Sequence, residues 1–225
     1  MWDSESGHPA QQGFNGSTMR YLYMTDFAKR YGSKDWFNEA KDYLVARRAA
    51  IQERLSTTFR FVDLNRKNGS TFSYEFASIL RDSGSVFGSV LDSLDKGKKG
   101  DFRIQTSFRD YRTLLLDEDP NIHHRTLQVR PLFPNGMLVP LSTLSQSNGT
   151  SDWWRAYNNV KHSEYQNFRD GNMQNAVLSV AALVILEHFV GVHLPDSLWV
   201  NIGIVYSDTT IDMSDERRLF HNGGK

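Results

Sequence analysis

One run of the sequence combines side chains that can act together on a phosphate ester. From Trp153 to His162 the chain reads WWRAYNNVKH, which holds a guanidinium, two amides, an ammonium and an imidazole. Arg155 and His162 are seven residues apart, and seven steps of a 3.6-residue helix return to within about 20° of the same face. Asn158 and Asn159 lie between them, so the run predicts a polar stripe on a helix rich in aromatic residues.

This stripe suits general acid–base chemistry on a phosphodiester. A histidine ordinarily titrates near pH 6.5, and proton transfer by such a group typically contributes 10²–10⁴ in rate. The fork of an arginine matches phosphate oxygens. Attack of a ribose 2′-OH on its own 3′-phosphate needs these functions and, in principle, no metal ion. The run therefore indicates RNA cleavage.

Each side chain of the run has an expected role in such a site. His162 would act as acid and base, and Arg155 would hold the phosphate. Asn158 or Asn159 would orient the imidazole or the phosphate. Lys161 and Tyr157 would support the site from the same helix. We predict that no cofactor and no metal ion takes part.

The same residue types also have a structural interpretation. Asn158, Lys161 and His162 would then be interior groups that satisfy a loop or the backbone through hydrogen bonds. Buried, satisfied histidines are commoner than catalytic ones. A solvent-open cleft shared by His162 and Arg155 would favour catalysis, and burial with every nitrogen satisfied would favour the structural role.

Most of the chain that must position this run is predicted to be helical. Apolar residues at steps of three, four and seven predict a helix from Asp35 to about Phe61. Ser73 is a favourable N-cap for a second helix, which runs to about Asp95. A third helix is predicted from about Arg103 to Leu116, because Pro120 stops it.

The second half of the chain adds two helices and short extended runs. Ser151 or Asp152 can cap the helix of the polar stripe, which is predicted to reach Phe168. A helix that is apolar nearly all round follows from Met173 to about Val190. A β-hairpin is predicted at about 126–142, and Leu198 to Tyr206 is a plausible strand.

These elements give a mainly α fold with a simple division of the chain. We expect an up-and-down bundle of about five helices over 34–193, with the hairpin as an excursion. A polar arm precedes it over 1–33, and an extension follows over 194–225. Gly84 and Gly88 in the second helix indicate either close approach of another helix or glycines that the surface tolerates.

Composition excludes several function classes. Lys plus Arg and Asp plus Glu number 26 each, so no overall field draws the chain to nucleic acid. Arg47–Arg48 and Lys96–Lys99 are interpreted as solvated faces. The absence of cysteine excludes disulfides and Cys-ligated metals and fits a reducing, cytoplasmic location. The apolar stretch Ala176 to Leu186 is about half of the roughly 20 residues that a membrane span needs, so a buried helix is expected.

Other site motifs carry little weight. His123-His124-Arg125 could be combined with His188 or His193 into a metal site, but no pair has ligand spacing on one helix. The sequence contains no GxGxxG, P-loop, GxSxG or HExxH motif.

A resemblance to the core of bacterial HEPN-superfamily domains is carried by the run WWRAYNNVKH, by Phe168 after it, and by the apolar helix Asn175 to Leu186. The segment Thr71 to Ala77, before the second helix, belongs to the same resemblance, which covers about Lys34 to Val190. The family's minimal signature is Arg, four to six residues and then His. Only Arg155 and His162 have that spacing in this chain.

The resemblance implies an all-helical bundle that forms a homodimer, in which the Arg–His helices of two protomers share one cleft. Many such domains are metal-independent endoribonucleases of toxin–antitoxin, abortive-infection or other defence systems. Others are catalytically inactive and bind a nucleotide or a partner protein, which is the alternative function here. Active members often place Asn, Asp or His directly after the Arg. Ala156 stands there in this chain, and Asn158 or Asn159 could supply the polar group.

Overall fold

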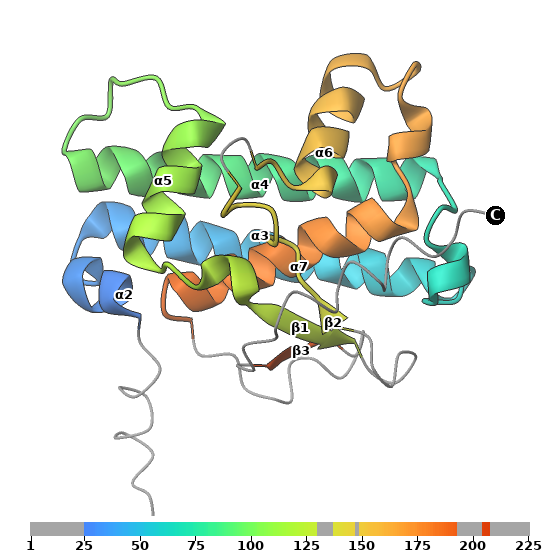
Figure 1. The fold of residues 1–225 in the computed structure, drawn as a ribbon, viewed down its shortest axis with the longest axis horizontal. Coiled ribbons are helices and arrows are strands. Elements are labelled where there is room, and N and C mark those ends of the chain that lie inside the picture. Colours follow the sequence, from blue (N-terminus) through green and yellow to red (C-terminus); the bar gives the residue numbers. More distant parts are fainter. Residues whose placement is uncertain (1–24, 130–136, 147–148, 193–203, 208–225) are drawn as a thin grey trace, which may run out of the picture.

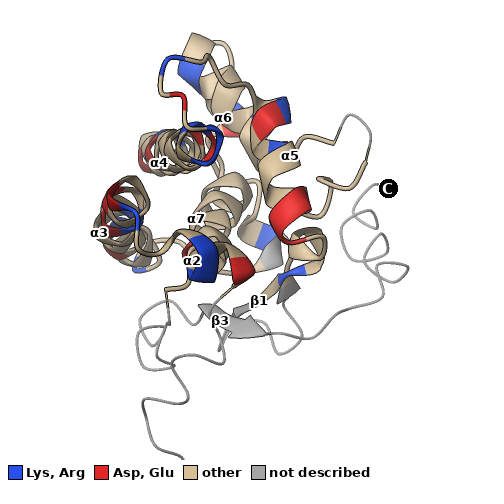
Figure 2. Ribbon diagram, turned by 90° about the vertical axis from the view of Figure 1, so that its left-hand side faces the viewer, with Lys and Arg blue, Asp and Glu red and all other residues tan. Residues whose placement is uncertain are grey.

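Three long helices form the centre of the fold (Figure 1). The computed structural model describes residues 25–129, 137–146, 149–192 and 204–207. The three helices α3 (Asp35–Thr58), α4 (Tyr74–Lys99) and α7 (Met173–Phe189) contact one another pairwise. Figure 2 shows them end-on, with the shorter helices α5 and α6 on one side. The predicted mainly helical fold is confirmed.

The directions of these helices follow from how their ends are joined. The 3-10 turn η1 (Arg66–Asn68) lies in the short connection between α3 and α4, which run antiparallel (Figure 1). The starts of α4 and α7 are held together by a bridge between Phe72 and Asn172. The amide of Met173 also donates to the carbonyl of Thr71 at 2.8 Å. α7 therefore runs in the same direction as α4 (Figure 1).

Capping residues fix where the helices begin and end. The hydroxyl of Ser73 accepts a backbone hydrogen bond from the first turn of α4, as predicted, and Gly100 ends the helix with φ +69°. α5 (Phe108–Glu118) begins five residues after the predicted Arg103. It starts there because Ser107 and Asp110 form a capping box, which outweighs the apolar pattern before it.

α7 is the most enclosed helix of the fold. Thirteen of its 17 residues are buried, including every residue from Val180 to Glu187. The apolar stretch Ala176 to Leu186 lies inside the bundle, as predicted.

 
Along the described part of the chain, no helix combines the length and the apolar character needed to cross a bilayer. The apolar surface of α7 is covered instead by the other helices of the bundle, chiefly α3 and α4.

A buried ion pair joins α7 to α3. Arg48 Nε donates to Glu187 Oε1 at 2.8 Å, and the two side chains are 3% and 0% exposed. Arg48 Nη1 also donates to Gln52 Oε1 at 2.7 Å. The interpretation of Arg47–Arg48 as a solvated face is therefore wrong for Arg48, whereas Arg47 is exposed. One helical step of about 100° separates the two side chains and decides which one faces α7.

The short helix α2 (Asp26–Tyr31) belongs to the bundle. The Phe27 side chain is fully buried, and its ring stacks on that of Phe189 with centroids 4.9 Å apart. The Thr25 hydroxyl caps α2 and also donates to the carbonyl of Phe189 at 2.6 Å. The part of the predicted arm from residue 25 onward thus packs on the bundle, and residues 1–24 lie outside the described residues.

A small antiparallel sheet lies at one side of the bundle, with the strand order β2-β1-β3. β1 (Thr126–Val129) pairs with β2 (Met137–Leu138) at two residue pairs and with β3 (Ile204–Ser207) at four. The predicted hairpin at about 126–142 therefore has a second strand of only two residues, and its turn lies outside the described residues. The main partner of β1 comes from the predicted extension 194–225.

The helix of the polar stripe, α6 (Asp152–Ser163), packs on α4 and α7. A Cβ atom built on Gly84 would lie 2.4 Å from the ring of Tyr157, and one on Gly88 would lie 3.3 Å from the ring of Trp154. Of the two interpretations of these glycines, close approach of another helix is confirmed. The missing side chains let α6 lie directly on α4.

We expect Gly84→Ala to lower the free energy of unfolding by about 1–2 kcal/mol. Overpacking against the buried Tyr157 ring costs about 1–3 kcal/mol and outweighs the gain of about 1 kcal/mol in helix propensity. Urea denaturation of both proteins measures the difference. In a Tyr157→Ala background the clash is gone, so the same substitution should stabilise; a loss of the same size in both backgrounds would contradict the steric explanation.

Candidate functional site

The outer face of α6 carries the predicted polar residues. Arg155, Asn159, Lys161 and His162 are exposed. Trp153, Tyr157 and Val160, on the opposite side, are buried against α4 and α7. Arg155 and His162 are seven positions apart, which corresponds to a rise of about 10 Å along the helix. A short oligonucleotide segment has about this length. Both side chains are open to solvent, and a cleft shared by them stays a prediction.

α6 ends five residues earlier than predicted. The side-chain amide of Asn167 donates to the carbonyl of Ser163 at 3.0 Å and to that of Asn159 at 3.2 Å. Carbonyl groups at a helix end need such partners, because no further turn satisfies them. The chain then turns into the 3-10 helix η3 (Phe168–Asp170), so that Phe168 is not part of α6.

Arg155 has two local partners, the carbonyl of Thr150 at 3.5 Å and the carboxylate of Asp152. Its Nη2 donates to Asp152 Oδ1 at 2.9 Å, and the two side chains are 65% and 80% exposed. An ion pair between such exposed groups contributes little to stability, because water screens both charges. A phosphate group can therefore compete with Asp152 for the guanidinium of Arg155.

The two asparagines have structural partners. Asn158 Nδ2 donates to the carbonyl of Trp154 at 3.0 Å, and Asn159 Nδ2 donates to Asp170 Oδ2 at 2.8 Å. The acceptors of these two bonds belong to α6 and to η3, and neither acceptor is the imidazole of His162. The role of either amide in orienting the imidazole or the phosphate stays a prediction, and the described bond of Asn159 fastens η3 to α6.

Tyr157 and Lys161, which are predicted to support the site, differ in their exposure. The Tyr157 side chain is only 5% exposed and packs over Gly84 and the ring of Trp154, whose centroid is 5.0 Å away. It supports the site by fixing α6 on α4 rather than by contacting a substrate. Lys161 Nζ lies 5.5 Å from the centre of the Tyr157 ring, at a position open to solvent.

The histidine pair lies on a separate element, the 3-10 turn η2 (Ile122–His124). The two imidazole rings have centroids 3.9 Å apart, and burial together with the charge of His124 lowers the pKa of His123 below its ordinary value. Over the described residues, no three His, Asp or Glu side chains lie close enough to hold a metal ion together. His193, a candidate ligand in the sequence, lies outside those residues.

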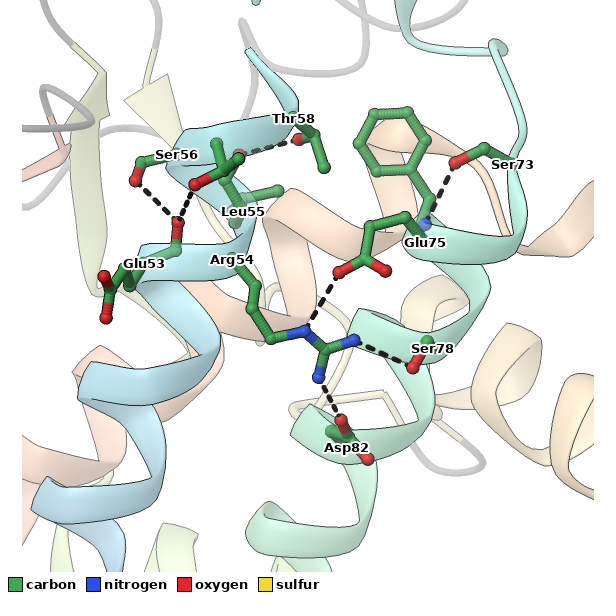
Figure 3. A network of polar contacts seen from close by, with 11 residues as sticks. Glu53, Arg54, Leu55, Ser56, Thr58, Ser73, Glu75, Ser78 and Asp82 are labelled. Carbon is green, nitrogen blue, oxygen red and sulfur yellow. Dashed lines mark hydrogen bonds and ion pairs between the residues drawn. The ribbon is translucent and has the colours of Figure 1, made fainter. Parts of the chain in front are cut away.

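A cavity of about 480 Å³ lies where α3 ends and α4 begins. Arg54 spans its wall and is drawn in Figure 3. Its Nε donates to Glu75 at 2.9 Å and its Nη2 to Ser78 at 2.8 Å, and its Nη1 pairs with Asp82. These bonds fasten α3 to α4. Each nitrogen of the guanidinium already has a hydrogen-bond partner. Arg54 therefore offers no unused donor group to an anion in the cavity.

Comparison of the chain with models of protein families, with curated proteins and with solved structures found no match. The resemblance to HEPN domains therefore stands on the residues of the WWRAYNNVKH run and on the elements around it. What the site can do has to be argued from its own geometry, in which α6 presents Arg155 and His162 to solvent.

Sequence reasoning missed a group of aromatic rings beside this face. The rings of Phe72 and Tyr74 each contact that of Phe168, although Phe72 and Tyr74 remain 43% and 75% exposed. A usable signal was present in the sequence, because two aromatic residues flank the N-cap Ser73, where a side chain has few neighbours from its own helix. The third ring comes from a distant segment.

Proposed function

We propose that this protein is a metal-independent endoribonuclease whose site is the outer face of α6. The observation that carries the proposal is the open position of Arg155 and His162 on one helix face, where the described partners of the Arg155 guanidinium are the exposed Asp152 and the carbonyl of Thr150. A phosphate clamp must be reachable by the phosphate, and an acid or base must be reachable by the group that exchanges the proton.

The reaction follows from these two side chains. The neutral imidazole of His162 takes the proton of a ribose 2′-OH, and the 2′ oxygen forms a bond to the adjacent phosphorus. Arg155 stabilises the charge on the phosphorane oxygens. The bond to the 5′ oxygen then breaks, and an imidazolium returns a proton to that oxygen. The products carry a 2′,3′-cyclic phosphate and a 5′-OH.

The proposal includes a homodimer, a cytoplasmic location and a role in a toxin or defence system. Two copies of α6 that face each other would place two Arg155–His162 pairs in one cleft, so that one imidazole can act as base and the other as acid. A chain without cysteine suits the reducing cytoplasm. A neutralising protein partner would be expected if free activity harms the cell.

We expect the purified protein to cleave a mixed RNA pool in EDTA and His162→Ala to cleave it 10²–10⁴-fold more slowly, because general acid–base catalysis is lost. Arg155→Lys should also be slow, since it keeps the charge but loses the fork. The measurement is the rate of appearance of fragments that end in a 2′,3′-cyclic phosphate.

Arg47→Ala is the matched control for these variants. It removes an exposed cation from α3 and should leave the cleavage rate unchanged. His162 is exposed, so its truncation should leave the melting temperature close to that of the wild type. No cleavage by a folded wild-type dimer, or equal cleavage by His162→Ala, would overturn the proposal and favour the inactive module that binds a nucleotide or a partner protein.

A further inference from the structure

Four aromatic rings lie at the end of α6 and at the start of α4. Phe72 meets Phe168 edge-on, with centroids 5.3 Å apart and planes at 85°, and Tyr74 lies 4.5 Å from Phe168 at 48°. Tyr74 is 75% exposed. Tyr165, three residues after His162, is 97% exposed, so almost none of its surface is covered by the described chain. We call Phe72, Tyr74 and Phe168, which are joined by ring contacts, the aromatic platform.

The backbone holds most of this platform in place. Phe72 lies in the bridge that joins the starts of α4 and α7. Phe168 belongs to η3, which Asn159 fastens to α6 through Asp170 at 2.8 Å. Surface rings of this size normally gain by burial, so rings held rigidly in the open mark a binding surface. A rigid, open ring also loses little conformational entropy when a flat ligand stacks on it.

Cations lie beside the platform. The guanidinium carbon of Arg169 is 5.8 Å from the centre of the Phe72 ring, and Lys161 is exposed on the last turn of α6. Over the described residues, neither Arg169 nor Lys161 has a carboxylate partner. The nearby acid Glu164 is paired with Arg81. The platform therefore combines open rings with unpaired positive charge.

We propose that the aromatic platform stacks unpaired bases of single-stranded RNA and so delivers the strand to the Arg155–His162 face. Every base has a π-face that stacks on an aromatic side chain, and neighbouring cations follow the phosphate backbone. A protein partner would also cover exposed rings. The adjacent cations and the exposure of the Phe72 and Tyr74 rings favour a polyanion with flat bases.

The platform and the proposed site are close enough for one strand to reach both. Phe168 follows His162 by six positions in the chain, so the distance between their Cα atoms is at most about 21 Å. At about 3.4 Å per stacked nucleotide, this span corresponds to at most about six nucleotides. The choice of RNA as the polymer rests on the proposed function, whereas the stacking itself needs no 2′-OH.

The test is binding of a fluorescent 2′-O-methyl 12-mer, which cannot be cleaved by 2′-OH attack, measured by anisotropy at fixed low salt. Phe72→Ala/Tyr74→Ala should weaken binding roughly 5- to 150-fold for each ring that stacks a base. Tyr74→Phe should bind like the wild type, because it keeps the ring. The same sequence as a duplex should bind more weakly than the single strand.

Phe102→Ala is the matched control. Phe102 is 57% exposed and follows the opposite end of α4, so its loss should leave binding unchanged. Equal binding by the wild type and Phe72→Ala/Tyr74→Ala, or no binding by either, would overturn the platform. Cleavage that persists in that variant would then still support the proposed function. Platform-dependent binding without any cleavage would support the inference and overturn the nuclease.

Discussion

Arg48→Met is expected to lower the free energy of unfolding by about 3–5 kcal/mol at neutral pH, among the largest effects of any single change in this chain. The substitution keeps most of the side-chain volume but removes the partner of Glu187, whose side chain is fully buried in the bundle. A buried carboxyl group without a partner has lost its hydration and gains nothing in return. Urea denaturation measures the loss.

Two further variants separate the charge from the packing. Arg47→Met alters the neighbouring, exposed arginine and should change stability by less than about 0.5 kcal/mol. Adding Glu187→Leu to Arg48→Met removes the unpaired carboxyl group and should restore most of the loss, because apolar residues often replace a buried ion pair without cost. If Glu187→Leu fails to restore stability, the loss comes from packing and not from the unpaired charge.

The stability of the wild type is expected to depend on pH through Glu187. Burial raises the pKa of Glu187 to about 7, and the hydrogen bond and charge of Arg48 only partly oppose this. Between pH 4.5 and 7 the folded protein holds a proton that the unfolded chain has lost, so stability falls as the pH rises. The total fall from this group is on the order of 3 kcal/mol, and it is complete above about pH 7.

Glu187→Gln tests this dependence. Glutamine keeps a hydrogen-bond acceptor for Arg48 but does not titrate in this range. The difference in unfolding free energy between the wild type and the variant should therefore change by about 3 kcal/mol from pH 4.5 to 7.5. Other groups, such as His123, titrate in both proteins and cancel in that difference. A difference that is independent of pH would contradict a raised pKa of Glu187.

Local patterns in the sequence predicted the helices and the polar face well. The Ser73 cap, the apolar periodicity of α3 and the apolar character of α7 depend on residues within a few positions of one another. The seven-residue spacing of Arg155 and His162 is equally local, and the structure places both on the exposed face of α6. Local geometry alone decides such features, so they can be read from the sequence.

The tertiary structure decided which polar groups are buried and which segments meet. Arg48 and Arg47 have the same side chain, and only the packing of α7 on α3 sends one of them inside to Glu187. The bond from the Asn159 amide to Asp170, which fastens η3 to α6, also depends on how a later segment folds back. The platform joins Phe72 to Phe168, and β1 pairs with β3, across gaps of more than 70 residues. These outcomes depend on contacts between distant segments, whose geometry no local pattern contains.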